Sequence, residues 1–378
     1  MTDARELRVC AVIQSFRPVL GGAQMQLERL LPLLAARGVA VEAVARGARG
    51  APREEQIDGG LVRRTRVAGD SVVASLDYVL EGAAWLTRRR RVLDVVHAHG
   101  ALSEGLIATF GRALGVPMLV KILRAGPDGD VQTLLRRPGG RRRLALLVRR
   151  AWFVAITPEI RAELEGMGVP PARVFDIPNG VDAATFHPAG ADERRALRDR
   201  LGLPPGPLLV YTGRLDPVKR LDVLVRMLTA APGCRLLLVG SGPDRARLES
   251  LAAEVGVRDR VRFAGAVPSV EDHLRAADAF VTPSTAEGLS NALLEAMACG
   301  LPCLAAPASG VRSLLADGRG FVVEDERSWA PSVETVVAGA ANGAGAHAAR
   351  YVRAHLTLDR TADALRGAYE QVLDEAER

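Results

Sequence analysis

Short runs of consecutive apolar residues alternate along this 378-residue chain with longer segments in which apolar residues recur at helical spacing. The short runs predict buried strands, and the longer segments predict helices that cover a sheet. In the first half, a helix is expected over Ala23–Arg37, and the expected strands are Arg8–Ile13, Val39–Ala45, Val95–Ala98, Met118–Ile122 and Trp152–Ile156. This alternation is typical of an α/β fold with a parallel sheet.

The alternation stops in a polar stretch from Pro188 to Pro207 and then begins again. The strands expected after it are Leu208–Thr212, Arg235–Val239, Val261–Phe263, Ala279–Thr282 and Cys303–Ala305. The length also favours two domains. We therefore expect two doubly wound, Rossmann-like α/β domains, over 1–185 and 186–355, which face each other across a cleft. Ligands of such sheets bind outside the carboxyl ends of the strands.

Composition narrows the class of protein. Apolar residues make up 48% of the chain, aromatic residues only 4%, and no apolar run is long enough to span a membrane. The charged N-terminus does not resemble a signal peptide, so we expect a cytoplasmic protein. Four scattered cysteines, at positions 10, 234, 299 and 303, predict small buried residues and not a disulfide framework or a zinc site.

The net charge of +6 comes partly from two basic clusters, Arg88–Arg91 and Arg136–Arg150, and the second holds seven arginines and no carboxylate. Neither cluster contains interleaved aromatic residues or a nucleic-acid-binding signature, so we expect no nucleic acid partner. The second cluster could contact an anionic membrane at its inner face, or an acceptor phosphate, as a peripheral protein would. A solvated helix face is the alternative.

A candidate phosphate site follows the first strand of the second half, in T-G-R-L-D-P-V-K. Gly213 turns the chain, Asp216 can cap a helix, and Pro217 suits its first position. Arg214 would then project from the loop and Lys219 from the first helical turn, at the positive end of the helix. A basic loop beside a well-capped helix is the alternative.

The next strand ends in Gly240-Ser241-Gly242-Pro243, which partly matches a dinucleotide fingerprint. Arg245 stands where the third glycine should be, and the proline interrupts the phosphate loop, so NAD is excluded as the ligand. Gly240 can still allow a nucleotide to approach the backbone closely.

Two glutamates, Glu287 and Glu295, lie in the run E-G-L-S-N-A-L-L-E-A-M-A-C-G-L-P. On one continuous helix they would be separated by about 12 Å and about 80°, too far to act on one atom. We therefore expect Ser290 or Asn291 to cap the helix, with Glu287 in the preceding loop and Glu295 in the second turn. Two carboxylates at different depths of a crevice suit a polyhydroxylated ligand, while solvated surface carboxylates are the alternative.

Three features of the first half could also bind a ligand. Gly21 and Gly22 follow the first strand and permit positive φ and close approach, although a plain turn explains them as well. His97 and His99 end a strand, where buried or cleft-lining histidines are a better interpretation than a metal pair. Asp128-Gly129-Asp130 resembles a metal-binding element but is far in sequence from the nucleotide-type loops, so we expect no metal.

Together these residues resemble the retaining glycosyltransferases of family 4, also called group 1, which have the GT-B fold. The resemblance is most specific where strand-G-R-L-x-x-x-K, V-G-x-G-P and E-x7-E occur in the family's order. It implies a donor-binding second domain and an acceptor-binding first domain completed by a C-terminal helix over 356–378. It also implies that the donor-binding residues are Gly22, Gly213, Arg214, Lys219, Gly240, Glu287, Gly288, Leu289 and Glu295.

By the same resemblance, Arg214 and Lys219 bind the diphosphate, Glu287 holds donor-sugar hydroxyls, and Glu295 holds the ribose. The backbone of Gly288 and Leu289 contacts the sugar or a phosphate, and Gly22 approaches the donor phosphates from the first domain. The catalytic group would be Arg214, Lys219 and Glu287.

The acceptor side departs from the family pattern. The run Val120–Arg124 lacks the histidine of the family's Thr-x-His element, and Ser313 stands where a glutamate usually follows Gly-Gly-x-x. Lys121 and Arg124 could supply positive charge instead, although a structural role is the alternative for either. The acceptor-side candidates are His99, Lys121, Arg124 and Asp130.

The resemblance implies transfer of a hexose-type sugar, with retention, from a UDP- or GDP-type nucleotide sugar to an acceptor hydroxyl, without a metal or other cofactor. The leaving phosphate would accept the acceptor proton, so no protein nucleophile is needed. A GT-B sugar-nucleotide epimerase and a non-catalytic nucleotide-sugar-binding protein are the alternatives.

Overall fold

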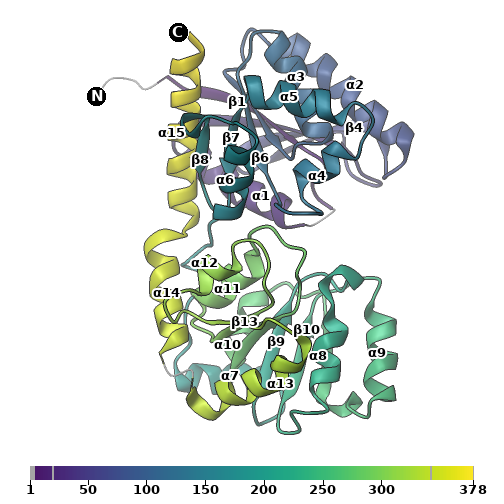
Figure 1. The fold of residues 1–378 in the computed structure, drawn as a ribbon, viewed down its shortest axis with the longest axis vertical. Helices are drawn as coiled ribbons and strands as arrows, with labels where there is room; N and C mark the ends of the chain where they lie inside the picture. Colours follow the sequence, from purple (N-terminus) through teal and green to yellow (C-terminus); the bar gives the residue numbers. More distant parts are fainter. Residues whose placement is uncertain (1–4, 19–20, 341–342, 378) are drawn as a thin grey trace. The chain divides into compact units, whose positions relative to one another are not determined.

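The computed structural model describes residues 5–18, 21–340 and 343–377 (Figure 1). The chain divides into two compact units. The first unit contains Met1–Gly180 and Leu358–Arg378, and the second contains Val181–Thr357. These limits lie a few residues from the expected boundaries at 185 and 355.

The first unit is built on an eight-stranded sheet of order β3-β4-β2-β1-β5-β6-β7-β8. Every pairing is parallel except the β3–β4 hairpin. The strands are β1 (Leu7–Ile13), β2 (Val39–Gly47), β3 (Glu54–Ile57), β4 (Gly60–Ala68), β5 (Val95–His99), β6 (Met118–Ile122), β7 (Trp152–Ala155) and β8 (Val174–Asp176). The helices are α1 (Gly22–Ala35), α2 (Val72–Arg89), α3 (Ser103–Ala113), α4 (Asp130–Leu135), α5 (Gly140–Arg150), α6 (Pro158–Gly166) and α15 (Leu358–Glu377), with a short η1 (Pro171–Arg173).

The second unit has a six-stranded parallel sheet of order β11-β10-β9-β12-β13-β14. Its strands are β9 (Leu208–Thr212), β10 (Arg235–Val239), β11 (Val261–Gly265), β12 (Ala279–Thr282), β13 (Cys303–Ala305) and β14 (Phe321–Val322). The helices are α7 (Ala191–Arg200), α8 (Leu221–Met227), α9 (Arg245–Glu254), α10 (Val270–Ala276), α11 (Asn291–Ala298), α12 (Val311–Leu315), α13 (Trp329–Thr335) and α14 (Ala344–His355). Short helical turns are η2 (Pro217–Lys219), η3 (Arg258–Arg260), η4 (Glu326–Ser328) and η5 (Val336–Ala340).

The expected fold class is confirmed, because both units are α/β layers around parallel sheets. Each expected strand is present within two residues at either end, and the expected helix over Ala23–Arg37 is α1. The sequence pattern missed β3, β4, β8 and β14. β4 carries three arginines and pairs with the acidic edge strand β3, so this hairpin lacks the apolar run that marks the central strands.

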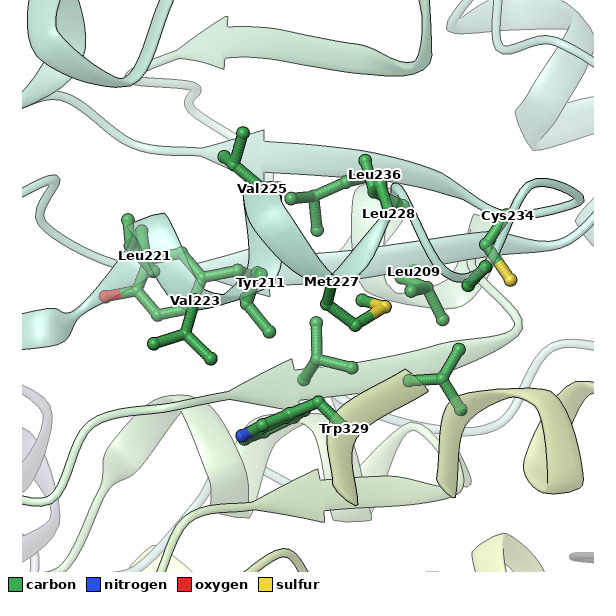
Figure 2. Packing of buried hydrophobic residues seen from close by; sticks show 14 of the residues in the cluster. Leu209, Tyr211, Leu221, Val223, Val225, Met227, Leu228, Cys234, Leu236 and Trp329 are labelled. Carbon is green, nitrogen blue, oxygen red and sulfur yellow. The ribbon is translucent and has the colours of Figure 1, made fainter. Parts of the chain in front are cut away.

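One core cluster of the second unit lies on one face of its sheet (Figure 2). Alternate residues of β9 and β10, including Leu209, Tyr211 and Leu236, point toward α8. Trp329 of α13 packs into the same cluster. The four cysteines of the chain are free and buried, as the sequence predicted. This packing fixes the strands whose carboxyl ends carry the candidate site.

Candidate functional site

The strand order of the second sheet places two loops beside each other. β9 lies between β10 and β12, so the chain leaves β9 toward one side of the sheet and reaches β12 on the other. Ligands of doubly wound sheets bind at such a switch point, outside the carboxyl ends of the strands. The loop after β9 carries the expected phosphate-binding residues, and the loop after β12 carries Glu287.

The loop after β9 folds largely as its residue types require. Gly213 adopts φ 142°, and the Asp216 carboxylate accepts a hydrogen bond from the Val218 amide at 3.3 Å. Pro217 begins the short turn η2, as a proline at the first helical position should. Lys219 lies in the helical turn that Asp216 caps, as expected, but this turn is a separate element. Lys219 ends η2, and Arg220 (φ 54°) interrupts the helical path before α8 begins.

An ion pair joins the two loops. Lys219 Nζ donates to Glu287 Oε1 at 2.5 Å, and both side chains are about four-fifths buried. Arg214 is mostly exposed and lies 3.3 Å from the Asp216 carboxylate. Burial and the nearby carboxylates of Glu287 and Asp216 raise the pKa of Tyr211, whose hydroxyl donates to the Arg214 carbonyl at 3.2 Å. The edge thus presents cations and a carboxylate within one small region.

The helix after β12 has the cap that the sequence predicted. Ser290 Oγ accepts from the Leu293 amide at 3.3 Å, and α11 begins at Asn291. Glu287 accordingly lies in the preceding loop, and Glu295 lies in the second turn and is 6% exposed. The alternative of a surface carboxylate is therefore wrong for Glu295. Leu289 is also buried, and Gly288 precedes it in the loop.

Glycines at the ends of β9 and β10 let two loops pack backbone to backbone. Gly240 adopts φ 141°, and a Cβ there would lie 1.8 Å from the Gly213 carbonyl oxygen. A Cβ at Gly242 would lie 2.1 Å from the Leu215 carbonyl oxygen. The Gly213 amide donates to the Val239 carbonyl at 2.9 Å, which fixes this contact. The loop contact alone requires these glycines, and their approach to a nucleotide stays a prediction.

Two buried hydroxyls at this edge were missed by sequence reasoning. Thr212 ends β9 and Ser284 follows β12, and within the described residues neither hydroxyl has a hydrogen-bond partner. Buried polar atoms are normally paired, so these two could accept or donate a hydrogen bond to a ligand. Their position after consecutive apolar strand residues was the only signal in the sequence.

The corresponding edge of the first sheet buries its polar groups. His99 and Lys121 are register partners on β5 and β6, and they are only 4% and 5% exposed. Lys121 Nζ donates to Asn179 Oδ1 at 2.8 Å, and burial lowers the pKa of this lysine to about 8. Burial, with Lys121 nearby, lowers the pKa of His97 to about 3, and burial also lowers the pKa of His99. These histidines are therefore neutral at physiological pH, as expected of buried or cleft-lining histidines.

A buried carboxyl, Glu104, lies in the first turn of α3, close to this edge. Burial raises its pKa to about 7, and its Oε1 atom has no partner within the described residues. Asp130 Oδ2 accepts from the Leu123 amide at 3.0 Å, so this aspartate ties the β6–α4 connection together. Nothing in the sequence distinguished Glu104 from a helix-surface glutamate.

The other candidates of the first unit lie at the start of α1 and in the loop between β6 and α4. Gly21 has φ −151° and is the N-cap of α1, so the expected use of positive φ at this residue was wrong. Gly22 is the first residue of α1, and Arg124 is half-buried in the loop after β6. Asp128 pairs with Arg136, and no group of three His, Cys, Asp or Glu residues in the described part of the chain could hold a metal ion.

The basic cluster Arg136–Arg150 covers the connection between α4 and α5 and the whole of helix α5. Arg143 donates to the Leu102 carbonyl, while Arg137, Arg141, Arg142, Arg149 and Arg150 are exposed. Among the described helices, none is both long and apolar enough to cross a membrane. Contact of this cluster with a membrane surface stays a prediction.

Asn179 and Gln26 fix the end of the first unit and were not recognised in the sequence. Gln26 Nε2 donates to the Gly180 carbonyl at 2.6 Å, and the Gly180 amide donates back to Gln26 Oε1 at 3.3 Å. The run Pro178-Asn179-Gly180 was the available signal, since it is typical of a structured turn.

A cavity of about 290 Å³ lies at the amino ends of β1 and β2, and it is lined by Glu6, Arg8, Val9, Ala40, Glu42, Arg89 and Leu93. Ligands of open α/β sheets bind at the opposite edge. The cavity therefore plays no part in the candidate site.

Comparison with known proteins gives matches over both units. The family model described as "Glycosyl transferases group 1" matches residues 206–338, and the "Glycosyl transferase 4-like domain" matches residues 21–180. The D-inositol 3-phosphate glycosyltransferase of Acidothermus cellulolyticus is 31% identical, over 94% of this chain and 86% of that protein. The protein of the same description from Kineococcus radiotolerans is 33% identical, over 87% of this chain and 86% of that protein.

Solved structures match along nearly the whole chain. Sucrose-phosphate synthase from Thermosynechococcus elongatus has a TM-score of 0.83 at 21% identity, covering 98% of this chain and 100% of that one. Anabaena HepE in complex with UDP-glucose has a TM-score of 0.73 at 19% identity, covering 98% of this chain and 99% of that one. At these identities the likeness concerns the fold, which is that of GT-B glycosyltransferases.

Proposed function

The chain belongs to the group 1 glycosyltransferases, and on this premise we propose that it transfers a hexose-type sugar from a nucleotide diphosphate sugar to an acceptor hydroxyl with retention of configuration. The observation that carries the proposal is the Lys219–Glu287 ion pair at the switch point of the second sheet. A cation and a carboxylate in contact there are suited to a ligand with both phosphates and hydroxyls.

Charge development in the reaction matches the groups at this edge. Breaking the anomeric bond leaves positive charge on the sugar and negative charge on the departing diphosphate. In the proposed reaction Lys219 and Arg214 stabilise the diphosphate, and preorganised charges of this kind often give the largest catalytic contribution. Because Glu287 already lies beside Lys219, it is proposed to accept hydrogen bonds from sugar hydroxyls next to the transferred bond.

The proposed mechanism needs no protein nucleophile and no metal. The leaving phosphate oxygen takes the proton of the acceptor hydroxyl on the same face of the sugar, so the new bond replaces the old one with retention. Glu295 binds the ribose hydroxyls, and the backbone of Gly288 and Leu289 contacts the sugar or a phosphate. Gly213 and Gly240 shape the loops, and Gly22 is the proposed phosphate contact in the first unit.

The acceptor is proposed to bind in the first unit, with His99, Lys121, Arg124 and Asp130 as the candidate residues. The complex of Anabaena HepE with UDP-glucose supports a UDP-type donor as the first to be tested, followed by GDP-type donors. The description of the relatives as D-inositol 3-phosphate glycosyltransferases puts that compound first among the acceptors to be tried.

The test is incubation of the protein with labelled UDP- and GDP-sugars and a panel of acceptors, D-inositol 3-phosphate included. The proposal predicts a glycosylated product whose anomeric configuration, read by NMR, equals that of the donor. An isomerised donor without product would instead indicate an epimerase, and binding without turnover would indicate a nucleotide-sugar-binding protein.

A further inference from the structure

Helix α2 of the first unit is apolar on two opposite faces. One face packs on the sheet and contains Ala74, Tyr78, Gly82, Trp85 and Leu86. The other carries four aliphatic side chains that point to solvent, which we call the α2 apolar row, with exposed fractions of 77% for Val72, 63% for Val73, 59% for Leu76 and 68% for Leu80.

The α2 apolar row is a continuous feature and not scattered exposure. With 3.6 residues per turn, its four residues fall within about 100° of the helix circumference. Outside the row, the large apolar side chains exposed in the described part of the chain are only Val92, Phe110 and Val218. Singly exposed apolar residues are ordinary, whereas a group of this kind marks an interaction surface.

The two acidic residues of α2, Asp77 and Glu81, do not interrupt the row, because both carboxylates are paired with residues outside the helix. The Asp77 carboxylate accepts from the Val67 amide at 2.9 Å. Glu81 pairs with Arg53 at 2.9 Å and with Arg66 at 2.7 Å. The exposed strip is therefore free of negative charge over about two helical turns.

Exposed arginines follow the α2 apolar row in the sequence. Arg88, Arg90 and Arg91, at the carboxyl end of α2, are exposed. Helix α3 packs against α2, and α5 packs against α3, so the three helices lie side by side (Figure 1). The exposed arginines of α5 accordingly belong to the same helical layer as the row.

We propose that the α2 apolar row inserts into the interface of an anionic lipid bilayer, with the arginines that follow it binding lipid phosphates. An amphipathic surface of aliphatic residues bordered by cations is the chemistry that such an interface recognises. A second copy of the chain fits less well, because a two-fold contact would bring equivalent cationic surfaces together. The proposal concerns a surface of the first unit and does not depend on the proposed sugar transfer.

Co-sedimentation of the full chain with vesicles tests the proposal. We expect binding to phosphatidylcholine vesicles that contain phosphatidylglycerol, and little binding to phosphatidylcholine alone. The variant Leu76→Gln/Leu80→Gln keeps the charge and should weaken the partition by about tenfold or more, because two aliphatic groups no longer leave water. The matched control Ala230→Gln/Ala346→Gln changes exposed residues of the second unit and should bind like the parent.

A second pair of variants separates charge from position. Arg88→Glu/Arg91→Glu should abolish the preference for anionic vesicles, whereas Arg350→Glu/Arg353→Glu on α14 has the same net charge and should retain most of it. Circular dichroism melting curves equal to the parent's exclude unfolding as the cause. Absence of vesicle binding by the parent, or equal binding by the glutamine variant, would overturn the proposal. A dimer of the parent that the glutamine variant loses, without vesicle binding, would assign the row to self-association instead.

Discussion

The polar residues at the carboxyl edges of the two sheets differ in how far they are exposed to solvent. At the edge of the second sheet, Arg214 is mostly exposed and the Lys219–Glu287 pair is partly exposed. At the edge of the first sheet, His99, Lys121 and Glu104 are almost fully buried. Burial disfavours the charged form of each of these three groups.

The difference indicates what each edge can bind. A diphosphate requires cations that can reach it, and the second unit has a mostly exposed Arg214 and a partly exposed Lys219. The first unit instead has buried groups whose charged forms burial disfavours, and the pKa values of Glu104 and Lys121 are about 7 and about 8. An acceptor hydroxyl, which is uncharged, is compatible with such an edge. The comparison therefore agrees with the proposed division into donor and acceptor units.

The largest effect is expected from Glu104→Gln. The pKa of Glu104 is about 7 in the folded protein, against 4.5 for an unperturbed carboxyl, so the folded state holds the extra proton between these values. The free energy of unfolding of the first unit should therefore fall as pH rises from about 4.5 to 7, by on the order of 3 kcal/mol. Glutamine does not ionise, so the variant avoids this loss of folding free energy. It should be more stable than the parent above pH 7.

The measurement is urea unfolding at several pH values in a Trp329→Phe background, so that fluorescence reports Trp85 and Trp152 of the first unit. Buried His97, with a pKa of about 3, raises stability with pH over part of the same window. The difference between parent and variant isolates Glu104 from that trend. Glu6→Gln changes an exposed carboxyl of the same unit and should follow the parent. If the free energy of unfolding changes with pH equally in Glu104→Gln and in the parent, burial does not disfavour the charged form of Glu104.

For the second edge, Lys219→Ala should lower kcat/KM for the nucleotide sugar about ten- to hundredfold. The lost charged contacts are worth about 1.5–3 kcal/mol. Initial rates at varied donor concentration measure kcat/KM. Titration with UDP measures how much of the change is a loss of nucleotide affinity. Arg220→Ala removes the adjacent cation, which pairs with Glu326, and serves as the matched control with a small effect. Equal losses in both variants would mean that general positive charge matters and not the position of Lys219.

The loop contact under this edge predicts that Gly240→Ala destabilises the second unit by about 2 kcal/mol. Alanine would have to adopt φ 141°, with its Cβ pressed against the Gly213 carbonyl. Urea unfolding in a Trp85→Phe/Trp152→Phe background, in which fluorescence reports Trp329 of the second unit, measures the effect. Gly233→Ala is the control, because that glycine has open space and an ordinary φ. An unfolding midpoint like that of the parent would contradict the close backbone packing.

The sequence predicted the second unit well because each of its signals is local. Ser290 precedes the helix that it caps, and Asp216-Pro217 precedes the turn that it closes. Apolar runs mark buried parallel strands directly. What the sequence did not predict is the break at Arg220, which places Lys219 at the end of a separate turn. No residue type near Lys219 signals that the helix must start again.

The first unit was predicted less fully because its site depends on distant contacts. Lys121 looks like a surface cation in sequence, and only its position between packed strands and Asn179 shows that it is buried. Glu104 has the spacing of any residue near a helix start, and its high pKa results from tertiary burial. The β3–β4 hairpin was missed for a related reason, since its polar residues are held by pairing and not by an apolar pattern.

The smallest expected effect concerns the cap that positions Glu295. Ser290→Ala should destabilise the second unit by about 1 kcal/mol, because the Leu293 amide loses its side-chain acceptor. Ser290→Asn keeps an acceptor at the N-cap and should stay close to the parent in urea unfolding. If the alanine variant also loses affinity for UDP while the asparagine variant does not, the start of α11 aligns the buried carboxylate with the donor. If the alanine variant is as stable as the parent, the local cap contributes nothing, and the packing of α11 alone holds the second edge in place.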